Sequence, residues 1–280
     1  MMITDKDTNK LFLADCLPEK QPKFFPRFEK VLKDCNVDYE FLPGTKDIWA
    51  KDYMPVQVNK DKFIQFRYNP DYLKTPYWRK TISDADAICK AISLKPVKSE
   101  LVVDGGNIIR AEDKVIMCDK IFSENKNIPK NDLIGQLEEL FEVDKIIFVP
   151  WDKNDFTGHA DGMVRFIDNE TVFINDYSKE DAGFRKRFRK SIEDAGLKMV
   201  ELPYNPYSNK SYDWANGIYM NYLEMKDLII IPTFGMKEDE EAILIIEEAF
   251  KGKKVATVVS TELAKKGGIL NCISWTIGKN

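Results

Sequence analysis

Apolar residues recur at helical spacing in five segments of the chain. Within each segment they stand three or four positions apart, so that one face of a helix would be apolar. The segments cover residues 24–35, 85–92, 133–141, 184–195 and 242–250. Ser83 is the expected N-cap of the second helix, and Gly196 and Gly252 follow the fourth and fifth, where helices commonly end. The pattern predicts five amphipathic helices.

Short runs rich in β-forming residues lie between the predicted helices. One run follows each helix, at residues 39–42, 101–103, 146–149, 199–202 and 255–259. Four more lie at residues 63–68, 114–118, 171–175 and 228–231. The helices recur about every 50–60 residues, a period typical of repeated supersecondary units, and no linker-like stretch interrupts them. We therefore expect one α/β domain over residues 1–280, built from five units that each hold several strands and one helix.

Polar loops flanked by glycine follow the five strands at the same place in each unit. They cover residues 47–55, 104–107, 157–162, 212–217 and 267–272. In a closed ring of units, these five loops would meet near the axis. Because binding sites are commonly built from loops on a rigid scaffold, we expect the functional site there.

The composition excludes several classes of protein. Of the 280 residues, 44% are apolar and 31% charged, which excludes a disordered chain. The net charge is −4, whereas nucleic-acid binding usually requires a basic excess, so no nucleic-acid partner is expected. The basic run at residues 185–190 is interpreted as a solvated helix face. We expect no membrane partner, since every apolar stretch is far shorter than the ~20 residues of a spanning helix.

Cysteine usage and the first residues suggest a cytoplasmic protein. The five cysteines are scattered and form no C-x-x-C pair, which argues against a disulfide framework and against a zinc site. The chain starts without the basic and apolar regions of a signal peptide. A reduced, cytoplasmic protein without a bound metal is therefore expected.

Two residues are candidates for nucleophilic chemistry. His159 is the one histidine of the chain, and Asp161 would share its face on a strand. Cys272 is the one cysteine in a polar turn led by glycine. A hydrogen-bonded histidine without a catalytic role and a cysteine in the core are the plainer alternatives. A cysteine protease would use such a set, but it leaves the further acidic loop residues Asp52 and Asp104 unexplained.

Several carboxylates that converge on one cysteine suit a guanidinium substrate. This cation is planar, carries five N–H donors and does not easily lose its charge. Burying it requires carboxylates that bind it through charge-assisted hydrogen bonds. Its carbon is electrophilic enough for a thiolate, and its charge would help to keep Cys272 deprotonated.

Short motifs in a fixed order carry a resemblance to a known family. They are Trp49-x-x-Asp52-x-x-Pro55, Asp104-Gly-Gly-Asn107, Thr157-Gly-His159-x-Asp161-Gly-x-x-Arg165-Phe166, Asn216 with Asn221, Pro232-Thr-Phe-Gly235 and Gly-Gly-x-x-x-Cys272. From about residue 45 onward the chain resembles the agmatine deiminase and bacterial peptidylarginine deiminase family of guanidino-group-modifying enzymes. The resemblance implies a five-bladed α/β-propeller (pentein) fold of pseudo-fivefold ββαβ-type units, in agreement with the five units above.

The resemblance also implies a role for each candidate residue. Cys272 would attack the guanidinium carbon, and His159 would protonate the departing ammonia and then activate water. Asp104 would orient the imidazole, while Asp52 and Asp161 would hold the guanidinium nitrogens. The remaining two candidates, which would line the pocket, are Trp49 and Asn216. The small-molecule guanidine would be hydrolysed to a ureido product without a metal or organic cofactor.

Departures from the family pattern leave the substrate open. The family usually has Arg, Gly, Glu and His where this chain has Lys51, Met54, Asp104 and Asn271. Agmatine, peptidyl-arginine, free arginine and methylated arginine all fit the same core. Amidino transfer and a non-catalytic pentein binding protein are the alternatives to hydrolysis, and a homo-oligomer is compatible with the sequence. The aromatic segment 72–78 is expected to be core or a lid that selects the substrate.

Overall fold

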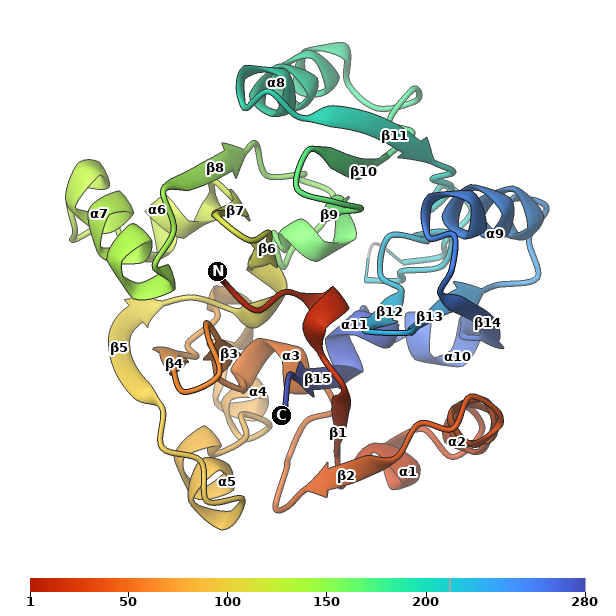
Figure 1. The fold of residues 1–280 in the computed structure, drawn as a ribbon, viewed down its shortest axis with the longest axis horizontal. Coiled ribbons are helices and arrows are strands. Elements are labelled where there is room, and N and C mark those ends of the chain that lie inside the picture. Colours follow the sequence, from red (N-terminus) through yellow and green to blue (C-terminus); the bar gives the residue numbers. More distant parts are fainter. Residues whose placement is uncertain (212, 280) are drawn as a thin grey trace.

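Five three-stranded sheets form a ring in the computed structural model, which describes residues 1–211 and 213–279 (Figure 1). The strands lie around the axis with the innermost strand of each sheet nearest the centre. From the centre outward the sheets are β15 (Ser274–Ile277), β1 (Lys10–Ala14) and β2 (Tyr39–Leu42); β3 (Val56–Gln57), β4 (Phe63–Arg67) and β5 (Val97–Val102); β6 (Ile109–Arg110), β7 (Lys114–Cys118) and β8 (Lys145–Val149); β9 (Val164–Phe166), β10 (Thr171–Asn175) and β11 (Lys198–Leu202); β12 (Leu223–Met225), β13 (Leu228–Thr233) and β14 (Lys254–Val259).

One long helix in each unit links the middle strand to the outer strand. These two strands are parallel, so the chain must cross over between them, and the helix makes that crossing. The helices are α2 (Phe25–Asp34), α5 (Ala85–Ala91), α7 (Lys130–Phe141), α8 (Ala182–Asp194) and α9 (Glu238–Ala249), and they lie on the perimeter of the ring (Figure 1). Their apolar faces are buried, as with Phe28 and Leu32 of α2. The five predicted helices and their ββαβ-type units are confirmed.

The ring closes by pairing the two ends of the chain. β1 is antiparallel to β15, with Lys10 opposite Ile277, and parallel to β2. The first blade therefore takes its innermost strand from the last residues of the chain. This arrangement replaces an open sheet edge by hydrogen bonds between distant segments.

Short helices occupy the connections. The α-helices are α1 (Leu17–Lys20), α3 (Ala50–Tyr53), α4 (Pro76–Arg79), α6 (Lys120–Glu124), α10 (Thr261–Ala264) and α11 (Leu270–Ile273). The 3-10 helices are η1 (Asp5–Asp7), η2 (Asp71–Leu73), η3 (Gly105–Asn107) and η4 (Ala160–Gly162). No helix in residues 1–211 or 213–279 has the length and apolar character needed to span a membrane.

Some details differ from the sequence-based expectation. Ser83 does not cap α5: the side chain of Asp84 accepts the hydrogen bond from the Ala87 amide, while Ser83 accepts from Lys46. The strand expected at 101–103 is the end of β5, which begins at Val97. Tyr212, with which the fourth predicted loop begins, lies outside the described residues.

A group of buried charges lies around the N-terminal helix η1. Asp5 forms ion pairs with Arg110 at 2.6 Å, Arg165 at 2.8 Å and Lys51 at 3.7 Å. Burial would raise the pKa of Asp5, but these three cations hold it well below its usual range. Because Arg165 and Lys51 also stand close to the loops of the ring, this cluster ties the N-terminal segment to the blades.

Candidate active site

Four of the five predicted loops contribute residues to one pocket, and Asp104 of the remaining loop, which is not a lining residue, contacts the lining residue His159. Four of the loops contain a short helix before an innermost strand, where α3 precedes β3, η3 precedes β6, η4 precedes β9, and α11 precedes β15, while the loop at 212–217 lies before β12. The pocket has a volume of about 1140 Å³, and the residues lining it include Trp49, Asp52, His159, Asp161 and Cys272. The ring therefore brings together side chains that are more than 200 positions apart in the sequence.

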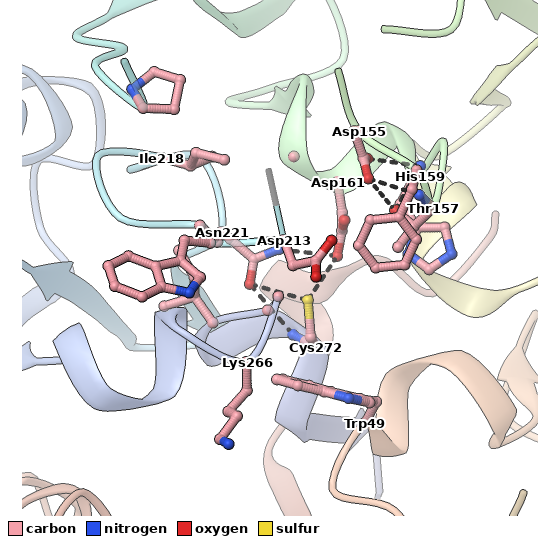
Figure 2. A pocket seen from close by; sticks show the side chains of 18 of the residues that line it. Trp49, Asp155, Thr157, His159, Asp161, Asp213, Ile218, Asn221, Lys266 and Cys272 are labelled. Carbon is pink, nitrogen blue, oxygen red and sulfur yellow. Dashed lines mark hydrogen bonds between the residues drawn. The ribbon is translucent and has the colours of Figure 1, made fainter. Parts of the chain in front are cut away.

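Cys272 lies on α11 with its sulfur directed toward two polar side chains (Figure 2). The Sγ atom is 3.4 Å from Oδ1 of Asn221 and 3.8 Å from Oδ2 of Asp161. Only 8% of the residue is exposed. Burial, together with the negative charges of Asp161 and Asp52, raises the pKa of the thiol well above its usual range. Without a bound cation, the thiol is therefore protonated at neutral pH.

Asp161 is held by two amide side chains. Its Oδ2 accepts hydrogen bonds from Nδ2 of Asn271 at 2.7 Å and from Nδ2 of Asn221 at 3.1 Å. The Oδ1 atom of Asn221 in turn accepts from the backbone amides of Asn271 and Cys272. Asn271, where the family usually has His, thus fixes the carboxylate that faces the sulfur.

His159 stands between two other carboxylates. Its Nε2 is 3.1 Å from Oδ2 of Asp104, and its Nδ1 is 3.6 Å from Oδ1 of Asp52. Burial alone would lower the pKa of His159, but Asp52, Asp104 and Asp161 raise it to about 10. The imidazole is therefore protonated at neutral pH and can act as an acid. His159 occupies the N-cap position of the short helix η4, which contains Asp161, so the two residues do not lie on one strand.

The glycines of the Asp104-Gly-Gly-Asn107 motif permit a close approach of η3 to α3. The Gly106 amide donates to Oδ1 of Asp52 at 3.0 Å. A Cβ atom on Gly106 would stand 2.4 Å from Nδ1 of His159, and one on Gly105 would stand 1.9 Å from the carbonyl oxygen of Lys51. Burial raises the pKa of Asp52 to about 7. The carboxylate is therefore poised to ionise when a cation binds.

The other two predicted pocket residues differ in position. Trp49 lines the pocket and packs so closely on Gly268 that a Cβ there would be 2.5 Å from the indole ring. Asn216 is buried and is not among the residues that line the pocket. The role of Asn216 in substrate binding stays a prediction, and Asn221 is the asparagine that lies beside Cys272.

The pocket wall is acidic. Its acidic members are Asp47, Asp52, Asp152, Asp155, Asp161, Glu180 and Asp213, against four lysines, Lys20, Lys179, Lys210 and Lys266. Within the described part of the chain, no arginine lines this pocket and no lysine or arginine forms an ion pair with Asp52, Asp104 or Asp161. The same residues contain no group of three or more His, Cys, Asp or Glu side chains with the arrangement of metal ligands. The site therefore has negative charge that a bound cation would balance.

Sequence reasoning named Asn221 and Asn271 only as motif positions, and it placed Tyr72 only in a segment expected to be core or a lid. Tyr77 and Trp78 of that segment are exposed, so the segment is not core, and Tyr72 and Trp78 line the pocket. Asn221 stands two residues before its innermost strand, as Cys272 does, and this position could have identified it. Tyr72 comes from η2, outside the repeated loops, and its hydroxyl donates to Oδ2 of Asp104 at 2.9 Å. Nothing in the repeat pattern points to that contact.

Known proteins share this fold. The solved structure of C. jejuni agmatine deiminase aligns with a TM-score of 0.81 at 19% identity, covering 100% of this chain and 96% of that chain. DDAH from Pseudomonas aeruginosa aligns with a TM-score of 0.60 at 13% identity, covering 96% and 99%. These likenesses confirm the five-bladed pentein fold.

The sequence comparisons identify the family. Residues 22–277 match the family model of the Porphyromonas-type peptidyl-arginine deiminases, and the chain belongs to that family. A protein of Photobacterium profundum, named as a candidate agmatine deiminase, is 22% identical over an alignment of 277 positions. The alignment covers 84% of this chain and 76% of that protein. The predicted resemblance is confirmed.

Proposed function

We propose that the chain is a deiminase that hydrolyses a small guanidine compound to a ureido product and ammonia. The observation that carries the proposal is the set of three buried carboxylates around Cys272 and His159, which lacks a lysine or arginine partner in the described residues. A guanidinium ion supplies the missing charge and enough N–H donors for two carboxylates. Membership of the deiminase family supports this function.

Asp52 and Asp161 are proposed to bind the guanidinium nitrogens. Both carboxylates line the pocket and both act on the charge of Cys272. The bound cation offsets their negative charge, so the Cys272 thiol releases its proton to the solvent as the substrate arrives. The nucleophile is thus formed in the presence of the group that it attacks.

The covalent steps need only the described side chains and water. The sulfur of Cys272 bonds to the guanidinium carbon, and His159 donates a proton to the nitrogen that leaves as ammonia. The carbon is then bound to Cys272 as a thiouronium ion. Neutral His159 takes one proton from water while the water oxygen bonds to the carbon. The carbon–sulfur bond then breaks, and the second proton of the water returns to the sulfur of Cys272. One water molecule is consumed, and ureido product and an ammonium ion are released.

The charge of the wall favours agmatine over free arginine. Free arginine carries an α-carboxylate, which would meet an acidic wall without an arginine to bind it. The amino group of agmatine is positive and fits this wall. Curated relatives named as candidate agmatine deiminases support the same choice. Peptidyl-arginine is the second candidate, because exposed aromatic side chains, Trp78, Phe156 and Tyr207, stand among the pocket residues.

The test compares agmatine, free arginine and a blocked arginine peptide, with assays for both ammonia and ureido groups. The largest kcat/KM is expected for agmatine, with no product from Cys272→Ala. A larger kcat/KM for the peptide would assign the second candidate instead. Release of the substrate's own alkylamine, without ammonia or ureido product and only when an acceptor amine is added, would contradict hydrolysis and indicate amidino transfer. No product from any of the three compounds would overturn the proposed function.

A further inference from the structure

Tyr72 shares a carboxylate oxygen with the catalytic histidine. Its hydroxyl donates to Oδ2 of Asp104 at 2.9 Å, and the same oxygen lies 3.1 Å from Nε2 of His159. The other oxygen, Oδ1, is buried and has no hydrogen-bond partner among the described residues. The two rings are also close, with centroids 6.2 Å apart. Asp104 therefore divides one acceptor atom between the phenol and the imidazole.

Lys120 holds the turn that carries Tyr72. Its ammonium group pairs with Asp71 at 2.8 Å and donates to the Thr157 carbonyl oxygen at 2.6 Å, two residues before His159. It lies 5.2 Å from the centres of the Tyr72 and Trp151 rings. The side chain is only 1% exposed. One buried cation thus links the turn of Tyr72 to the loop of His159.

The loop before His159 is shaped around this lysine. Gly158 has a φ of +66°, and a Cβ there would stand 2.5 Å from Cδ of Lys120 and 3.0 Å from Nε1 of Trp151. Only glycine combines that backbone conformation with that contact. The motif Thr157-Gly-His159 therefore requires glycine at its centre, because the side chain of Lys120 packs directly against Gly158.

We propose that Tyr72 is a positioning residue that acts on His159 through Asp104, and that Lys120 holds Tyr72 in place. The hydrogen bond from the phenol stabilises part of the negative charge on Oδ2 of Asp104 and orients the carboxylate toward Nε2 of His159. Without it, the full charge faces the imidazolium, which then releases its proton less readily to the leaving ammonia. Burial and the charge of Asp104 raise the pKa of Tyr72 well above its usual range, so the hydroxyl stays a donor.

Other charges also face the imidazole and stay constant in this comparison. Besides Tyr72, the titratable and charged groups on the elements packed around it are Asp52 on α3, Asp104 before η3, Asp161 on η4, Tyr68 after β4, Lys120 and Glu124 on α6, and Cys272 on α11, and none of them is changed in Tyr72→Phe. Asp52 stands at Nδ1, on the other side of the ring from Asp104. A change at Tyr72 should therefore affect Nε2 more than Nδ1.

The single histidine makes this measurable without turnover. With ¹⁵N-labelled histidine, correlations through the carbon-bound ring protons report the two nitrogens of His159 separately. Tyr72→Phe keeps the ring and removes the hydroxyl, so the Nε2 resonance should move and the Nδ1 resonance should move less. Tyr77→Phe is the matched control, because Tyr77 is 72% exposed in the same segment. An unchanged Nε2 resonance in Tyr72→Phe, or an equal change in Tyr77→Phe, overturns the proposal.

Kinetics provide the second readout, which rests on the proposed function. Tyr72→Phe should lower kcat about tenfold with little change in KM, since the phenol acts on proton transfer and not on binding. A higher KM with an unchanged kcat in Tyr72→Phe contradicts the proposal. If no guanidine compound is turned over by the wild type, the proposed function fails while the resonance of Nε2 still decides the role of Tyr72.

The lysine is tested by Lys120→Met and by the milder Asp71→Asn, which leaves the buried ammonium in place. Both should move Nε2 in the same direction as Tyr72→Phe, with a smaller shift for Asp71→Asn. If Lys120→Met does not fold, Asp71→Asn alone decides. An Nε2 resonance that stays at its wild-type position in every folded variant of the pair refutes the role of Lys120.

Discussion

Replacing Asp161 by asparagine is expected to change two reactions of Cys272 in opposite directions. The carboxylate is 3.8 Å from the sulfur, and two negative charges about 4 Å apart repel each other by about 4 kcal/mol at an effective dielectric constant of ~20. Asparagine removes this repulsion and keeps the shape of the side chain. The thiolate is then easier to form in the empty site, so Cys272 should react with iodoacetamide at pH 7 roughly tenfold faster or more.

Turnover by the same variant should fall. The guanidinium ion loses one of its buried charged partners, a loss that typically costs about 2–5 kcal/mol. This corresponds to a decrease of roughly 30- to 4,000-fold in kcat/KM for agmatine. Faster alkylation with slower turnover separates a carboxylate that binds the cation from one that activates the thiol.

The assay follows alkylation on the Cys272 peptide by mass spectrometry, because Cys16 and Cys35 are partly exposed. Asp61→Asn is the matched control, since its side chain is 81% exposed, pairs with Lys60 and is not among the residues that line the pocket. Both rates of this control should equal those of the wild type. If alkylation and turnover of Asp161→Asn decrease together, Asp161 acts as the base for the thiol and the reasoning is refuted.

Three further predictions test the electrostatics and the packing. Burial raises the pKa of Asp52 to about 7, and a cation binds the ionised carboxylate, so the KM for agmatine should rise as the pH falls below about 7. Asp52→Asn should abolish this pH dependence of KM. A pH-independent KM in the wild type would contradict the prediction. Gly106→Ala places a Cβ 2.4 Å from Nδ1 of His159, so kcat should fall about 100-fold while thermal denaturation still shows a folded protein; wild-type kcat would disprove the close approach. Asp5→Asn should lower the free energy of unfolding by about 3 kcal/mol at pH 7, measured by urea denaturation. Since the pKa of Asp5 is lowered in the folded state, this stabilisation is present above the ordinary carboxyl pKa of about 4 and is lost as the pH falls below it; a difference that grows in acid would have the wrong sign.

The sequence predicted the repeating architecture because the repeat is local. Each long helix has its own apolar face and its own stop, so residues such as Phe28 and Gly196 can be interpreted within a short window. The innermost strands gave no such signal. β3 and β6 have only two residues each, which is too short for an alternating pattern, and they form because neighbouring strands pair with them.

The site was predictable where the repeat placed it and not elsewhere. Cys272, His159, Asp52 and Asp161 lie together because their loops enter innermost strands at one end of the ring. Asn221, and not Asn216, stands two residues before its innermost strand, as Cys272 does. The start of that strand, β12, could not be predicted from the sequence. The contacts of Tyr72 and Lys120 depend on how two neighbouring blades pack against each other. The spacing of residues along the chain does not predict this packing.

The direct test of the central claim is a single-turnover experiment with agmatine and excess enzyme, quenched in acid at short times. We expect ammonia to appear first, together with a mass increase on the Cys272 peptide that decays as the ureido product forms. Cys272→Ser should give neither the adduct nor the product at the wild-type rate. Ammonia and ureido product that form together at every time point, at an equal rate in Cys272→Ser, would contradict catalysis through Cys272.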